Sequence, residues 1–194
     1  MTVKQLLLKS VYPFLAFINK KFKMNTLINS SDVKANTPFH AMELKLIDGN
    51  TFKLDSLKNK KIMLVNTASD CGYTAQYDDL QKLSEIYKDK LVILGFPSND
   101  FGQQEKADDT TIKDFCKVNF GVTFPLMAKS TVRKRDTQND VFNWLSDKNK
   151  NGWNDMAPTW NFCKYLVDEN GNLTHFFEAA IEPGDERVLN AIEN

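Results

Sequence analysis

The chain has 194 residues, of which 42% are hydrophobic and 26% are charged, which suits a single globular domain and argues against a disordered or low-complexity chain. Lysine plus arginine and aspartate plus glutamate both number 25, so the formal net charge is zero and the composition offers nucleic acid no broad basic surface. Three cysteines are too few for a disulfide scaffold, and two distant histidines give no metal-ligand spacing, so we expect a cytoplasmic protein without a metal or another cofactor.

The first 31 residues differ from the rest of the chain in charge. They contain five lysines and no acidic residue, so the remainder has five more acidic than basic residues. Between the lysines lies an apolar stretch of about 13 residues, which is shorter than the roughly 20 that span a bilayer. Three interpretations stay open: an appended helix or tail, a segment that contacts an anionic membrane surface, and an export signal, which the lack of a small-residue cleavage site disfavours.

A polar run marks the start of the main domain. Asparagine and serine are frequent over residues 25–32, and Pro38 follows shortly after them. Such a composition is typical of a linker. We therefore divide the chain into an amino-terminal extension with a linker, residues 1–37, and one folded domain, residues 38–194.

The folded domain begins with a predicted hairpin and continues with a strand–helix–strand unit. Apolar and polar residues alternate over residues 42–54 around a tight turn at Asp48-Gly49, which predicts a β-hairpin. Continuous apolar runs at 62–65 and 91–96 are typical of strands covered on both faces. Apolar residues three positions apart over 77–86 predict a helix between them, so the two strands should run parallel.

The remaining elements complete an α/β domain. They are a helix over 110–117 capped by Asp108 or Asp109, a helix over 138–145, strands at 165–168 and 173–177, and a terminal helix over 185–192. A parallel unit followed by a hairpin and a helix is the layout of a thioredoxin-like fold. We expect a central mixed sheet flanked by helices, with the hairpin of residues 42–54 at its amino-terminal side.

Cys71 occupies a position that favours chemistry. It lies four residues beyond Thr67, where the first central strand should end, and opens the turn into the first long helix. Unpaired N–H groups and the positive end of the helix dipole stabilise an anion there, which favours the thiolate. Thr74 stands where a disulfide exchanger would have its second cysteine, so Cys71 must act alone or with a distant thiol. The alternative is that Cys71 is only a small buried apolar residue.

A hydroperoxide is the electrophile that suits a lone thiolate. Its reduction needs a thiolate and hydrogen-bond donors for the departing oxygen, with no histidine base. A cysteine hydrolase would need an oriented imidazole, and neither His40 nor His175 has an orienting motif.

Neutral donors follow or precede strands at the same predicted edge of the sheet. Gln103 and Gln104 come after the strand at 91–96, and Trp160 and Asn161 come just before the strand at 165–168. Side-chain amides and the indole N–H can all donate to a thiolate or to a developing oxyanion. Because ligands bind beyond the carboxyl ends of parallel strands, we expect these residues to meet Cys71 there.

Three blocks of sequence resemble the signature segments of the glutathione peroxidase family. They are residues 65–74, 94–105 and 160–162, and the resemblance extends over roughly residues 38–192. It implies a thioredoxin-like fold and the reduction of hydrogen peroxide or organic hydroperoxides. It also implies that Cys71 is the peroxidatic residue and that Gln104, Trp160 and Asn161 complete a catalytic tetrad.

The same resemblance suggests how the enzyme is reduced again. Residues 115–125 resemble the resolving-cysteine segment of non-selenium members that use thioredoxin, which makes Cys116 the expected resolving residue and thioredoxin or glutathione the reductant. Cys116 lies on a predicted helix, so a disulfide with Cys71 would require local unwinding. Cys163 is expected to be a packed strand residue.

Three further expectations concern partners. A basic turn, made by Lys129 and residues 133–135, is either solvated or a contact for a glutathione carboxylate or an acidic partner. The short segment 146–158 favours a monomer or a weak dimer. The alternative function is a peroxide sensor that passes its disulfide to a partner protein.

Overall fold

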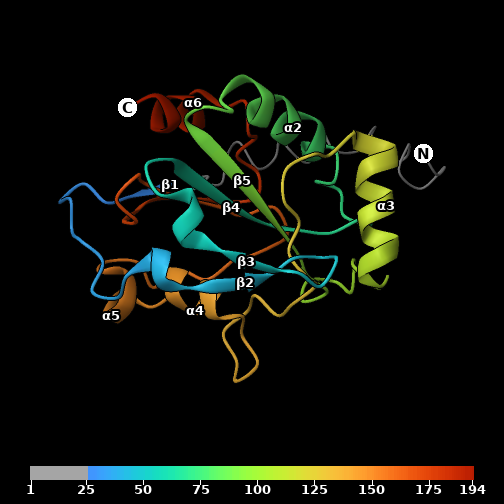
Figure 1. Ribbon diagram of the computed structural model, residues 1–194, viewed down its shortest axis with the longest axis horizontal. Coiled ribbons are helices and arrows are strands. Elements are labelled where there is room, and N and C mark those ends of the chain that lie inside the picture. Colours follow the sequence, from blue (N-terminus) through green and yellow to red (C-terminus); the bar gives the residue numbers. More distant parts are fainter. Residues whose placement is uncertain (1–25) are drawn as a thin grey trace.

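The structure is a computed structural model and describes residues 26–194 (Figure 1). Its centre is a mixed sheet with the strand order β1-β7-β6-β4-β5. The strands are β1 (Thr26–Ile28), β4 (Lys61–Thr67), β5 (Leu91–Pro97), β6 (Lys164–Val167) and β7 (Leu173–Phe177). The interior strand β4 lies between β6 and β5 and runs parallel to β5 and antiparallel to β6, so the sheet is mixed as expected.

Helices cover both faces of this sheet. They are α2 (Gln76–Ile86), α3 (Asp109–Phe120), α4 (Asp140–Leu145), α5 (Lys148–Asn151) and α6 (Glu186–Glu193). In Figure 1, α2 and α6 lie on one side of the sheet, and α4 and α5 lie on the other. All seven residues of β4 are buried, because apolar clusters pack on both of its faces. The thioredoxin-like layout predicted from the sequence is confirmed.

The predicted hairpin is also present. It consists of β2 (Glu43–Lys45) and β3 (Thr51–Lys53), which form a separate two-stranded sheet between two short 3₁₀ helices, Phe39–Ala41 and Leu54–Leu57. Gly49 adopts a positive φ of 89° in the turn, a conformation that glycine reaches without strain. Leu44 and Leu54 point into the cluster that also contains α4. The hairpin therefore covers one face of the main sheet.

The helix predicted over residues 110–117 is longer at both ends. The Asp108 side chain accepts a hydrogen bond of 2.8 Å from the Thr111 N–H, which confirms Asp108 as its cap. At the other end Gly121, with a φ of +61°, ends α3 and donates its N–H to the Lys117 carbonyl. Val118 and Asn119, in the last turn, are exposed and gave no periodic signal.

The interpretation of residues 25–38 as a linker is wrong in one part. Residues 26–28 form β1, which pairs antiparallel with β7 from Thr26–Phe177 to Ile28–His175. A strand of three residues among asparagine and serine has too little alternation to be detected, and its pairing with β7 defines it. The boundary at residue 37 stays a prediction.

The expectations for the lysine-rich segment of residues 1–31 fall mostly outside the described residues. Only Thr26 to Ser31 of that segment belong to the described part. Within residues 26–194, every helix is too short or too polar to cross a bilayer.

Candidate active site

Cys71 lies in a tight turn between β4 and α2. Its side chain is 6% exposed, and its sulfur accepts a hydrogen bond of 3.4 Å from the Tyr73 N–H. Thr74 holds the turn: its Oγ1 accepts from the Cys71 N–H at 3.1 Å and donates to the Ala68 carbonyl at 2.9 Å. Thr74, which stands where a disulfide exchanger has its second cysteine, therefore stabilises the turn that carries Cys71.

Two remote loops bring polar side chains to this turn. The fully buried Asn161 donates from Nδ2 to Gln104 Oε1 at 2.9 Å, and the Gln104 carbonyl accepts from the Asp70 N–H at 3.0 Å. The side chains of Asn161 and Trp160 lie near enough to the Cys71 sulfur for their N–H groups to favour the thiolate and lower its pKa. The structure thereby brings together Cys71, Gln104, Trp160 and Asn161. The Gln104 side chain contributes to the site through its hydrogen bond with Asn161.

Gln103 does not join the site. Its side chain is exposed, and its backbone has a positive φ of 52° in the turn that carries Gln104 inward. The position of the two glutamines after the strand did not distinguish them, because the difference depends on that turn, whereas the family resemblance pointed to Gln104.

The pKa of Cys71 is raised from its ordinary value. Burial raises it most, and the Tyr73 N–H, Asn161 and Trp160 lower it by donating to the thiolate. The sequence-based expectation that the helix start favours the thiolate is therefore wrong for the net effect. α2 begins only at Gln76, so the sulfur benefits from individual donors and remains subject to desolvation.

Asn66 is a positioning residue that the sequence analysis missed. It is fully buried in β4, donates from Nδ2 to the Trp160 carbonyl at 2.9 Å, and accepts from the Cys163 N–H at 3.1 Å. These bonds fix the segment that carries Trp160 and Asn161 against the central strand. The detectable signal was a single amide side chain that ends a continuous apolar run.

Glu105 is the second residue that was missed. It is 1% exposed, and its Oε2 accepts a hydrogen bond of 2.9 Å from Ser69 Oγ, which joins the loop of Gln104 to the loop of Cys71. Burial raises the pKa of Glu105 to about 7, against the effects of Ser69 and Lys129. Nothing in the local sequence distinguishes this carboxyl from a solvated one.

Trp160 and the basic turn form the outer rim of the site. The Trp160 side chain is 39% exposed and packs on Phe101, with 5.7 Å between ring centres. The Arg133 guanidinium lies 5.6 Å from the centre of the same Phe101 ring, and Arg135 forms an ion pair with Asp100. The basic turn is therefore partly packed against the loop that carries Gln104.

Cys116 lies on α3 and faces inward. It is fully buried, and burial raises its pKa to about 11, although the Tyr77 side chain lowers it. Cys163, equally buried, lies 3.6 Å from Thr159 Oγ1. All three cysteines are free thiols, and Cys71 and Cys116 belong to the same apolar cluster.

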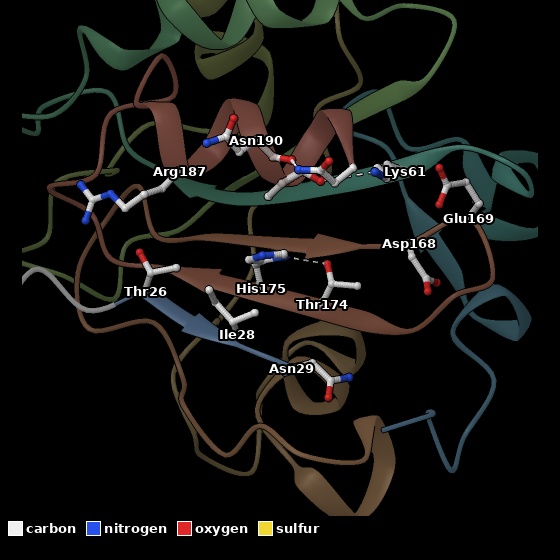
Figure 2. Close-up of a pocket in the computed structure, with 12 residues that line it drawn as sticks. Thr26, Ile28, Asn29, Lys61, Asp168, Glu169, Thr174, His175, Arg187 and Asn190 are labelled. Atoms are coloured by element: carbon white, nitrogen blue, oxygen red, sulfur yellow. Dashed lines mark hydrogen bonds between the residues drawn. The ribbon is translucent and has the colours of Figure 1, made fainter. Parts of the chain in front are cut away.

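A pocket lies away from this site. Its volume is about 600 Å³, and Figure 2 shows His175 and Thr174 of β7 beside Thr26 and Ile28 of β1. Lys61, the first residue of β4, also lines it, whereas Cys71 follows the last residue of that strand. Within residues 26–194 no three histidine, cysteine, aspartate or glutamate side chains are grouped as metal ligands.

The fold and the site define a class of protein: a thioredoxin-like domain with one buried cysteine at the end of its central strand and neutral donors directed at it. Comparisons with known proteins identify the family. Residues 39–146 match the sequence model of the family described as glutathione peroxidase. The chain belongs to the glutathione peroxidase family.

Individual relatives agree with this assignment. The chain is 44% identical to "Glutathione peroxidase-like peroxiredoxin GPX5" of Chlamydomonas reinhardtii, over 81% of this chain and 99% of that protein. It is 43% identical to "Glutathione peroxidase-like peroxiredoxin 2" of Saccharomyces cerevisiae, over 76% and 91% of the two chains. Among solved structures, the apo form of Trgpx has a TM-score of 0.62 and 31% identity, with 82% of this chain and 98% of that chain covered.

Family membership establishes the type of reaction. The protein is a thiol peroxidase, an oxidoreductase that reduces hydroperoxides with electrons from a thiol reductant and serves oxidative stress defence.

Proposed function

We propose that Cys71 is the residue that attacks the hydroperoxide, that Trp160 and Asn161 donate to the reacting atoms, and that Gln104 positions Asn161. One observation carries this assignment: donors from the segment before β6 converge on a sulfur that follows β4. The Asn161–Gln104 hydrogen bond of 2.9 Å fixes the buried amide in that arrangement.

In the first step the Cys71 thiolate attacks the terminal peroxide oxygen. An S–O bond forms, the O–O bond breaks, and the departing oxygen leaves as an alcohol or water after it takes up a proton. Sulfur is oxidised to a sulfenic acid and the peroxide is reduced. The N–H groups of Trp160 and Asn161 stabilise the negative charge that moves from sulfur to the departing oxygen.

In the second step we assign Cys116 as the resolving residue and thioredoxin as the reductant. Thr74 leaves Cys71 without a neighbouring thiol, and Cys116 is the cysteine of the same apolar cluster. Cys163, on β6, has Thr159 as its neighbour. Formation of the Cys71–Cys116 disulfide releases water, and a dithiol reductant then exchanges with that disulfide. The relatives named peroxiredoxins support this route over direct reduction by glutathione.

Three single substitutions test the assignment. We expect Cys71→Ser to abolish peroxide consumption, because no thiolate remains at the site. We expect Cys116→Ser to lose thioredoxin-coupled turnover while it still consumes about one equivalent of peroxide. Cys163→Ser is the matched control, since Cys163 is equally buried, and it should keep turnover.

The readout is peroxide consumed per chain with thioredoxin and its reductase, with mass spectrometry of the oxidised protein. A Cys71–Cys163 bridge, or full thioredoxin-coupled turnover of Cys116→Ser, would overturn the role of Cys116. A parallel assay with glutathione in place of thioredoxin tests the choice of reductant. Consumption of a single equivalent by the wild type with either reductant would instead favour the sensor. A monomeric or weakly dimeric state and a cytoplasmic location stay predictions.

A further inference from the structure

Two buried hydroxyl groups in the core between β4 and α2 have no hydrogen bond of regular geometry. They are Oγ1 of Thr67, the last residue of β4, and the phenol oxygen of Tyr77 on α2. Thr67, Tyr77 and Cys116 are all 0% exposed. The Tyr77 hydroxyl lies within interaction range of both the Thr67 hydroxyl and the Cys116 sulfur. The surroundings of Cys116 in α3 therefore include polar groups with unmet bonding capacity.

The Tyr77 ring connects the two cysteine regions. It contacts Phe162, the residue after Asn161, edge-on at 5.4 Å between ring centres, and Phe120, the last residue of α3, at 5.3 Å. The ring thus packs between the segment that supplies the donors to Cys71 and the helix that carries Cys116.

We propose that Tyr77 is a positioning residue for the resolving step. Its ring holds Cys116 in place inside α3, and its unsatisfied hydroxyl lowers the free energy needed to open α3. This inference rests on the proposed role of Cys116. A buried hydroxyl without a good partner destabilises the closed arrangement. Opening α3 admits water to that hydroxyl, which removes the penalty when Cys116 has to reach Cys71.

The step that Tyr77 assists is balanced without a further reactant. Cys116 loses its proton and attacks the sulfur of the Cys71 sulfenic acid. The S–S bond forms and the S–O bond breaks, and hydroxide leaves as water with the proton from Cys116. Cys116 is oxidised and the Cys71 sulfur is reduced.

The electrostatic effect of Tyr77 acts in the same direction. Its hydroxyl lowers the pKa of Cys116, whereas burial and the carboxyl of Glu105 raise it. Tyr77 from α2 and Glu105 from the loop before α3 are the titratable groups that act on this thiol. Loss of the hydroxyl should therefore decrease the thiolate fraction of Cys116 and stabilise the closed helix, and both changes slow the resolving step.

The test is Tyr77→Phe, which keeps the ring contacts and removes the hydroxyl. We expect the Cys71–Cys116 disulfide to form at least about fivefold more slowly after one equivalent of peroxide, since an unmet buried polar group corresponds to at least that factor. The pH dependence of this step should shift to higher pH. At high peroxide, Cys71 should be overoxidised to sulfinic acid more often than in the wild type.

Tyr165→Phe is the matched control. Tyr165 is equally buried but belongs to the other apolar cluster, and its hydroxyl donates to the Met156 carbonyl at 2.8 Å. This variant should lose stability and form the disulfide at the wild-type rate. The rate of the first step is measured separately as loss of the Cys71 thiol. The rate of disulfide formation in each variant is then compared relative to this rate, which corrects for any disturbance of the peroxide site.

The outcomes separate the two proposals. Disulfide formation at the wild-type rate and pH dependence in Tyr77→Phe would overturn the role of Tyr77 and leave Cys116 as the resolving residue. Slowing by the same factor in Tyr165→Phe would also overturn it, because loss of stability would then suffice. Absence of any Cys71–Cys116 disulfide in the wild type would overturn the proposed resolving role of Cys116, on which this inference rests.

Discussion

The reactivity of Cys71 depends on opposing effects at one sulfur atom. Burial disfavours the thiolate, and three N–H donors favour it: the backbone of Tyr73 and the side chains of Asn161 and Trp160. Because the net pKa is raised, each donor matters both for ionisation and for the charge that develops on the departing oxygen.

Trp160→Phe tests the indole donor alone. The substituted ring can still pack on Phe101, but the N–H toward sulfur is lost. We expect the second-order rate constant with hydrogen peroxide to fall by about 10²-fold, the usual effect of removing one preorganised donor, and its pH profile to move to higher pH.

The control for this variant is Trp153→Phe, whose indole N–H donates to the Leu173 carbonyl at 2.7 Å, away from Cys71. Stopped-flow measurement of Cys71 oxidation should show a rate near that of the wild type. Equal losses in the two variants would mean that the indole of Trp160 acts only in packing.

Glu105 predicts a particular pH dependence of stability. Its pKa is raised from 4.5 to about 7 in the folded protein, so between these values the folded state binds more protons than the unfolded state. The free energy of unfolding should therefore fall as the pH rises through this window, by at most about 1.4 kcal/mol per pH unit from this group. Denaturant unfolding of wild type and Glu105→Gln between pH 5 and pH 8 measures it.

Glutamine keeps the shape of the side chain and cannot ionise, so this contribution should be absent from the Glu105→Gln curve and should appear as a pH-dependent difference between the two curves. Parallel curves over the whole range would show that Glu105 titrates in the folded state as it does in the unfolded chain.

The sequence predicted that a lone cysteine after one strand would meet the Trp160-Asn161 pair before another, and the structure places these residues near one another. Their catalytic roles stay predictions. Asn66, Tyr77 and Glu105 could not be predicted, because their importance comes from burial among particular neighbours, which no short motif encodes.

At the scale of elements, α3 is the helix that the proposed resolving step requires to open. Cys116 lies in the second half of this helix, and its carbonyl accepts the Val122 N–H at 3.3 Å in the terminal turn. Gly121 ends the helix with a φ of +61°, and an added Cβ would meet no atom within 4 Å. A side chain at position 121 would therefore act only through backbone strain at this positive φ.

Gly121→Ala should destabilise this terminus by about 1 kcal/mol, because alanine is disfavoured at positive φ. We expect faster formation of the Cys71–Cys116 disulfide, by at most about fivefold, together with less protected amide hydrogens in the last turn of α3. Quenched-flow mass spectrometry and hydrogen exchange measure the two effects.

Gly184→Ala provides the matched change, since its Cβ would also meet open space but its φ lies outside the positive region. It should alter neither quantity. Unchanged disulfide kinetics in Gly121→Ala, despite lost protection, would show that opening of this turn does not limit the resolving step.

Long periodic elements were predicted well, and short ones were not. The strands at 62–65 and 91–96 and the helix at 77–86 each have a strong apolar pattern, and the structure extends them by a few residues at most. β1 and α5 have three and four residues, too few for a period to appear. β1 also depends on pairing with β7, far away in the chain.

At the scale of the whole molecule, the active site and β1 lie at different parts of the sheet. β1 covers the outer edge of β7, whereas Cys71 lies beyond the carboxyl end of the interior strand β4. An uncovered strand edge exposes unpaired backbone groups and promotes association between molecules.

Two truncations exploit this separation. Removal of residues 1–25 should leave both the melting temperature and peroxidase activity near those of the full chain, because β1 is kept. Removal of residues 1–31 deletes β1 as well and should lower the melting temperature and increase aggregation, with activity per folded molecule retained. Thermal unfolding, light scattering and the coupled assay follow these properties.

The first truncation is the control for the second. Loss of activity on removal of residues 1–25 alone would give the lysine-rich segment a part in catalysis, and equal stability of the two truncations would show that β1 adds nothing to the sheet.

The order of strand and helix patterns was sufficient for the architecture, because a parallel unit followed by a hairpin has few compatible topologies. The edge strand β1 and the way the loops turn inward required coordinates. The family resemblance concerned the residues that meet at the carboxyl end of β4, which are also the residues that the structure brings together.

Thr74 stands where a disulfide exchanger would have its second cysteine, so the two cysteines proposed for the redox cycle lie in the turn before α2 and in α3. A protein with both sulfurs in one turn can form a disulfide without changing the shape of its surface. Here the disulfide would join the turn before α2 to α3, so the oxidised form would have a different surface from the reduced form. A reductase could then recognise its client by shape before any electron is exchanged.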